Sequence, residues 1–152
     1  MDAEALKRAV RFLGYRTRSE TEVQRYLLRQ GYSTAIAQLT LKKLRALSYV
    51  NDEQFARNYA RSRAEGHGYG PIKIAQDLKS KGVAEPLIHA VLRETFGGSN
   101  EAKKARSCLE RHFRHKKLTE PKIARRAAAF LQRRGYSEEV IIDLIMCPVD
   151  DI

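Results

Sequence analysis

Apolar residues recur at three- and four-residue spacing along most of the chain, and few stretches alternate apolar and polar residues as strands do. In residues 19–30, for example, Val23, Tyr26 and Leu27 fall on one stripe. Such a stripe is typical of an amphipathic α-helix that buries one face. The pattern therefore predicts an all-α protein.

A short glycine-containing pattern occurs three times, about 50 residues apart, as RQGY, SKGV and RRGY around Gly31, Gly82 and Gly135. A leucine stands four residues before each glycine, and an apolar residue follows it directly. This is the pattern of a Schellman helix end, in which glycine adopts the left-handed conformation and the next residue folds back onto the helix. Ser33 and Ser137 are expected to cap the helices that follow. Each pattern thus predicts a sharp corner between two helices.

Helix starts occur at regular places between the corners. Ser19 is expected to form a capping box with Glu22, and Asn51 is expected to cap the helix that begins at residue 52. Pro71 suits the first position of a helix, and Thr119 is expected to cap a later one. The expected helices are 3–14, 19–30, 33–48, 52–64, 71–81, 85–96, 100–115, 120–134 and 138–146.

These helices group by threes, so we expect a tandem array of three three-helix repeats, about nine helices in all. Repeats of this size bury little surface alone and stack on their neighbours, which predicts an elongated and curved array. The expected repeats are 1–50, 51–97 and 98–152, the last with an acidic C-terminal tail.

The formal net charge is +11, and it is unevenly distributed. Residues 100–137 carry twelve basic and three acidic side chains, and residues 1–50 carry ten and four. Residues 51–99 carry seven basic and six acidic side chains, and residues 138–152 carry five acids and no bases. Segregated positive charge favours a polyanionic partner, either a nucleic acid or an acidic protein face.

Catalytic and metal-binding motifs are scarce. Cys108, His112 and His115 share one expected helix face and could begin a zinc site, but no fourth ligand is evident. His89 is expected to be a partly buried structural residue. Because no catalytic constellation appears, we expect no enzyme activity, no metal and no cofactor.

The cysteine content and the termini bear on the compartment. Cys108 and Cys147 form no disulfide framework, so two reduced thiols in a cytoplasmic protein are expected, with a bridge between them as the alternative. The N-terminal residues resemble no secretory signal, and the apolar runs are too short to span a membrane.

Four stretches resemble the RecX family of bacterial proteins that regulate the RecA recombinase. They are LSYVNDEQFARNYARSR at 47–63, GYGPIKIAQDLKSKGV at 68–83, RFLGYRTRSETEVQRYLLRQGY at 11–32 and FLQRRGYSEEVI at 130–141. The resemblance covers nearly the whole chain; Asn51 stands where the family often has Asp. It implies a helical monomer that binds RecA and the RecA–DNA filament. Such regulators limit filament extension, ATP hydrolysis, strand exchange and co-protease activity.

Basic clusters near the corners are the expected contact residues for RecA or DNA. They are Arg57, Arg61, Arg63, Lys79, Lys81, Lys116, Lys117, Arg125, Arg126, Arg133 and Arg134. The glycines Gly31, Gly82 and Gly135 are assigned to architecture only. Two alternatives stay open: a stand-alone nucleic-acid-binding protein, and weak direct binding of single- or double-stranded DNA beside the RecA contact.

Overall fold

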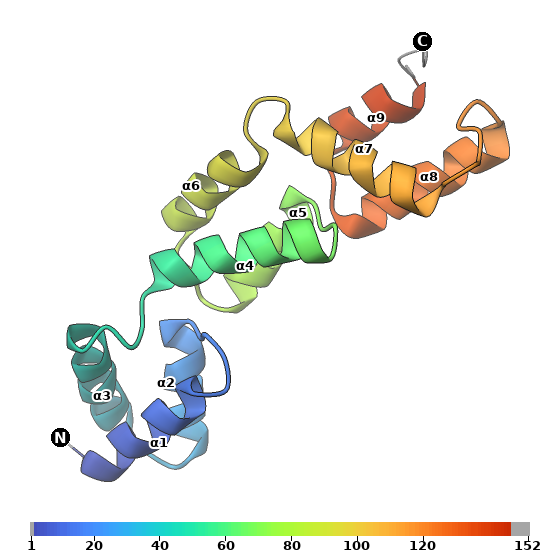
Figure 1. The fold of residues 1–152 in the computed structure, drawn as a ribbon. Coiled ribbons are helices and arrows are strands. Elements are labelled where there is room, and N and C mark those ends of the chain that lie inside the picture. Colours follow the sequence, from blue (N-terminus) through green and yellow to red (C-terminus); the bar gives the residue numbers. More distant parts are fainter. Residues whose placement is uncertain (1, 147–152) are drawn as a thin grey trace. The chain divides into compact units, whose positions relative to one another are not determined.

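The computed structural model describes residues 2–146, which form nine α-helices and no strand (Figure 1). The helices are α1 Ala3–Leu13, α2 Glu20–Arg29, α3 Thr34–Ala46, α4 Asp52–Gly66, α5 Pro71–Ser80, α6 Glu85–Phe96, α7 Asn100–His112, α8 Pro121–Arg134 and α9 Glu138–Met146. The predicted all-α fold is confirmed, and the predicted helix ends differ from the observed ones by up to three residues.

The three predicted corners are Schellman helix ends. Gly31, Gly82 and Gly135 have φ angles of +94°, +79° and +92°. The Tyr32 backbone N–H donates to the Leu27 carbonyl at 3.2 Å, and the same bond follows each of the other two glycines at 3.1 Å. Glycine is favoured here because a Cβ is disfavoured at positive φ.

The chain divides into two compact units, Met1–Asn58 with Leu78–Ile88, and Tyr59–Asp77 with His89–Ile152. The division passes through helices α4, α5 and α6, and therefore through the second predicted repeat. The repeat boundaries at 50/51 and 97/98 stay predictions.

The first unit has its core between α1, α2 and α3. Ala5 and Ala9 on α1 are fully buried, together with Val23 and Leu27 on α2. Small alanine side chains let helices approach closely, and the leucine and valine fill the space between them. The predicted capping box at Ser19 is present: its hydroxyl accepts the N–H of Glu22 at 3.1 Å, and the Glu22 carboxylate accepts the Ser19 N–H at 3.1 Å.

The Gly82 corner lies against the start of α2, within the first unit. The Ser19 hydroxyl donates to the Lys81 carbonyl at 2.6 Å, and the Arg25 guanidinium donates to the Ser80 carbonyl at 2.8 Å. A Cβ on Gly82 would overlap the side chain of Thr21. This glycine is therefore required both by its backbone conformation and by close packing.

The Gly135 corner lies in the same way against the start of α5, within the second unit. The Gly70 N–H donates to the Arg134 carbonyl at 2.7 Å, and the Ile72 N–H donates to the Gly135 carbonyl at 2.9 Å. A Cβ on Gly135 would lie 2.5 Å from the backbone nitrogen of Lys73. Two successive repeats thus use one docking scheme, in which a glycine corner meets the start of the second helix of the preceding repeat.

Several local predictions need correction. Glu120, not Thr119, is the residue before α8, and its side chain makes no capping bond. The reason is Pro121, whose fixed φ suits the first helical position and sets the helix start there. His115 lies beyond the end of α7 at φ +66°, so it does not share a helix face with Cys108.

Two further predictions concern side-chain placement. His89 is exposed, not partly buried. Cys108 is a buried free thiol, while the predicted state of Cys147 lies outside the described residues. Over residues 2–146, no helix is long and apolar enough to cross a membrane.

Candidate polyanion-binding site

Three of the predicted basic residues meet around one cavity between α7 and α8. Lys116, from the loop after α7, and Arg126 and Arg133, from α8, line a space of about 340 Å³. Arg126 and Arg133 are seven residues apart, which places them two turns apart on one helix face. All three side chains are exposed.

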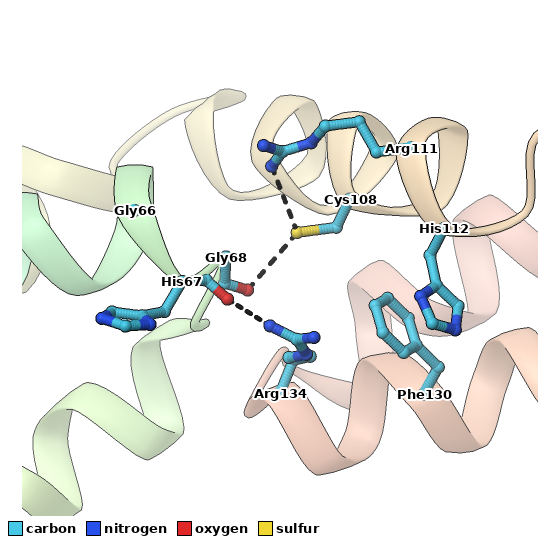
Figure 2. Close-up of a pocket in the computed structure, with 8 residues that line it drawn as sticks. All are labelled: Gly66, His67, Gly68, Cys108, Arg111, His112, Phe130 and Arg134. Atoms are coloured by element: carbon cyan, nitrogen blue, oxygen red, sulfur yellow. Dashed lines mark hydrogen bonds between the residues drawn. The ribbon is translucent and has the colours of Figure 1, made fainter.

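A fourth predicted residue, Arg134, lines a neighbouring cavity of about 240 Å³ (Figure 2). Arg111 from α7 and His67 from the loop after α4 line it as well. The guanidinium of Arg134 donates to the His67 carbonyl, which ties the end of α8 to this loop. His112 and Phe130 line both cavities, so the two spaces are adjacent.

A buried polar cluster forms part of the wall of the second cavity, because Gly68 and Cys108 line it. The carbonyl of Gly68 accepts a hydrogen bond from the Tyr136 hydroxyl at 3.0 Å and one from the Cys108 thiol at 3.4 Å. Burial, followed by the hydrogen bond with Cys108, raises the pKa of Tyr136, so its hydroxyl stays protonated and donates. Gly68 has a φ of +68°, and a Cβ there would lie 2.5 Å from the Cys108 sulfur.

Stacked rings separate the two cavities and hold α7 against α8. The imidazole of His112 stacks on the Phe130 ring with centroids 4.2 Å apart and an interplanar angle of 11°. Phe113 meets Phe130 edge to face at 5.7 Å, and the Arg134 guanidinium lies 4.9 Å from the Phe130 centroid. The basic side chains are therefore carried by two helices that these ring contacts join.

We call Arg111, Lys116, Arg126, Arg133 and Arg134 the α7–α8 basic surface. Among residues 2–146, no acidic side chain lines either of its cavities. Within the described part of the chain, none of the five cations forms an ion pair with a carboxylate. Arginine and lysine side chains concentrated in this way are suited to anions, since guanidinium forks bind phosphate or carboxylate oxygens in pairs.

Other predicted contact residues lie elsewhere and have local partners. Arg57 pairs with Glu53 at 2.8 Å, and Lys81 lies 3.6 Å from the Glu22 carboxylate. Arg63 contacts the His67 ring nitrogen at 2.7 Å and lies over the Tyr59 ring at 5.0 Å. These three side chains therefore have neighbours within the chain, although exposed pairs contribute little stability.

The remaining four predicted residues, Arg61, Lys79, Lys117 and Arg125, are exposed and line neither cavity. Arg111 and His67, by contrast, line a cavity but were not predicted as contact residues. Their grouping depends on the loop after α4 meeting α7 and α8, for which the sequence carries no local signal. His112 was noticed only as a zinc candidate.

The zinc alternative gains no support from the geometry. The Cys108 thiol points to the Gly68 carbonyl, and His112 stacks on Phe130. Over residues 2–146, no group of three or more His, Cys, Asp or Glu side chains is arranged to hold a metal ion.

The fold and the repeated corners define a class of all-α proteins built from three three-helix domains. Family models for the first, second and third three-helix domains of RecX match residues 5–44, 51–92 and 100–145, in that order. The chain belongs to the RecX family.

Individual relatives agree with this assignment. The regulatory protein RecX of Mycolicibacterium vanbaalenii is 32% identical over 90% of this chain and 77% of its own length. That of Bacillus velezensis is 33% identical over 91% of this chain, which spans 52% of that relative. A crystal structure of a regulatory protein RecX, 26% identical, matches with a TM-score of 0.79 over 95% of this chain and 72% of its own. The crystal structure of RecX from Lactobacillus salivarius, 21% identical, shares the fold with a TM-score of 0.81 over 99% of this chain and 97% of its own.

Proposed function

We propose that this chain binds the RecA recombinase and RecA–DNA filaments and limits filament extension, ATP hydrolysis, strand exchange and co-protease activity. The observation that carries the proposal is the match of all three RecX domains, in order, along the chain. The protein acts by binding, as a cytoplasmic monomer without a cofactor, and not as an enzyme.

The charge distribution agrees with a filament as the partner. A RecA–DNA filament offers phosphate groups, and a positively charged protein associates quickly with a polyanion through long-range attraction. The α7–α8 basic surface supplies exposed cations for such a contact. Arg57, Arg61, Arg63, Lys79, Lys81, Lys117 and Arg125 stay proposed contacts outside that surface.

A titration of RecA tests the proposal. The purified chain is added to RecA on single-stranded DNA, and ATP hydrolysis and strand exchange are followed. We expect both activities to fall at amounts of the chain well below those of RecA, because one molecule bound to a filament affects many subunits. Unchanged rates at equimolar chain would refute the proposal.

A second candidate function is stand-alone nucleic-acid binding, and the α7–α8 basic surface favours it. This candidate predicts tight binding to DNA in the absence of RecA, together with no specific effect on RecA beyond competition for DNA. Raising the DNA concentration separates the two candidates: competition for DNA disappears with excess DNA, whereas inhibition through RecA contacts persists.

A further inference from the structure

The two adjacent cavities of the α7–α8 basic surface share a wall and differ in their cations. One contains Arg111 and Arg134, and the other contains Lys116, Arg126 and Arg133. His112 and Phe130 form the shared wall. A ligand that fills both cavities therefore needs at least two anionic groups.

We propose that the two cavities bind neighbouring phosphate groups of one nucleic-acid strand and contact its backbone, not its bases. The inference deepens the proposed function, on which it rests for the presence of DNA in the regulated filament. It adds Arg111 to the contact residues and gives Arg126 and Arg133 a defined ligand.

The low exposure of the phenylalanine rings at this surface favours contact with the backbone. Proteins that grip single strands through their bases present exposed aromatic rings. Here Phe113 and Phe130 are only 9% and 6% exposed, and the exposed His112 ring has one face covered by Phe130. The binding should therefore depend little on base sequence and strongly on salt.

The charge environment favours phosphate over the carboxylates of an acidic protein face. Five cations meet around two cavities that no acid of the described residues lines, and four of the five are exposed. A third cavity on the same unit gives a contrast, because Lys103 and Lys104 share its lining with Glu65 and Glu110. Positive charge at this density suits the closely spaced phosphates of a nucleic-acid strand. Such a strand releases its condensed counterions when protein cations neutralise its phosphates.

The test uses the full chain without RecA and a fluorescein-labelled oligothymidylate, with anisotropy measured at several NaCl concentrations. The variant Arg126→Gln/Arg133→Gln removes two cations from one cavity, and Arg111→Gln removes one from the other. For single strands, each lost phosphate contact reduces the slope of log affinity against log salt by about 0.7. We therefore expect the slope to fall by about 1.4 in the double variant and by about 0.7 in Arg111→Gln.

Two matched variants complete the design. Lys42→Gln/Lys43→Gln removes the same charge from exposed positions of α3 and should leave the slope nearly unchanged. Arg126→Lys/Arg133→Lys keeps the charge and should restore most of the slope, which excludes misfolding as the cause. Arg134 is left in place because it also bonds to the His67 carbonyl.

Three results would overturn the inference. They are equal slopes for the double variant and the α3 control, displacement of the oligonucleotide by polyglutamate as readily as by polyphosphate, and no binding of oligothymidylate at low salt. If the chain still inhibits RecA while failing these tests, the proposed function stands and only the phosphate site is lost.

Discussion

The first and third repeats are built on the same corner but use their charged residues differently. In the first unit, Arg16 pairs with Glu22 at 2.5 Å and Arg45 pairs with Glu20 at 2.6 Å. Across residues 2–146, the cations of the α7–α8 basic surface have no such carboxylate partner. Paired cations contribute to folding, whereas cations without an acidic partner are available to an external anion. The comparison teaches that the candidate surface is distinguished by cations that gather around cavities with no described acid in their lining, rather than by the number of basic residues.

The corners themselves also differ between the two repeats. A Cβ on Gly31 would have no atom within 4 Å, whereas one on Gly135 would meet the backbone of Lys73. The first corner therefore requires glycine for its φ angle alone. The third corner requires it for the φ angle and for contact with the start of α5.

The largest expected effect follows from this difference. Gly31→Ala should lower the free energy of unfolding by about 1–2 kcal/mol, the cost of a left-handed alanine. Gly135→Ala should cost about 3 kcal/mol or more, because a backbone clash adds to that strain. Urea unfolding of both variants measures the two values, and equal losses would mean that the Gly135 contact contributes nothing.

The tyrosines after these glycines give the next largest contrast. Tyr136 is buried and donates to the Gly68 carbonyl, so Tyr136→Phe should cost about 1–2 kcal/mol. Tyr32 is half-buried, with the Arg8 guanidinium 5.9 Å from its ring centroid, and Tyr32→Phe should change stability by less than about 0.5 kcal/mol. Thermal unfolding of both variants provides the comparison. A larger loss for Tyr32→Phe would contradict it.

The ion pairs of the first unit predict a pH dependence. Burial alone would raise the pKa of Glu22, but the hydrogen bonds from Arg16 and the Ser19 N–H, with the charge of Lys81, outweigh it and lower the pKa. A carboxyl with a lowered pKa in the folded protein stabilises it above its unfolded value of about 4.3, and this contribution is lost as the pH falls through the folded pKa.

Glu22→Gln keeps the capping geometry but removes the charge, so it should cost about 1 kcal/mol at neutral pH. The stability of wild type and variant should converge as the pH falls below about 4. Denaturant unfolding across this pH range checks the prediction. A constant difference between the two proteins at all pH values would show that the charge of Glu22 is not what stabilises the fold.

The smallest expected effect compares one arginine from each region. Arg45→Gln breaks a partly exposed pair and should cost about 0.5 kcal/mol. Arg133→Gln breaks no ion pair within the described residues and relieves repulsion from its neighbours, so stability should stay the same or rise slightly. The two melting temperatures should differ in this direction, and a clear loss for Arg133→Gln would reveal a structural role for that residue.

Local chemistry explains which features the sequence predicted. The corners at Gly31, Gly82 and Gly135 and the capping box at Ser19 depend on neighbouring residues only, and all are confirmed. Thr119 was wrong because two helix-start signals lie side by side and Pro121 decides between them. Such competition is settled by backbone geometry that composition does not reveal.

Tertiary contacts explain the rest. Arg126 and Arg133 could be placed on one face of α8 from spacing, but their meeting with Lys116 depends on how α7 packs against α8. Arg111 lines a cavity only because the loop after α4, more than forty residues away in sequence, lies beside it. The docking of the Gly82 and Gly135 corners on the preceding repeat was likewise beyond any sequence pattern.

One measurement tests the central claim that the cations of the third repeat without acidic partners carry the interaction with the filament. RecA's DNA-dependent ATP hydrolysis is titrated with wild type, Arg126→Gln/Arg133→Gln and Lys42→Gln/Lys43→Gln. We expect the third-repeat variant to require roughly a hundredfold more protein for half-inhibition, since two charge-assisted contacts are lost, and the α3 variant to match wild type. Equal inhibition by all three proteins, or an equal loss in both variants, would contradict the account.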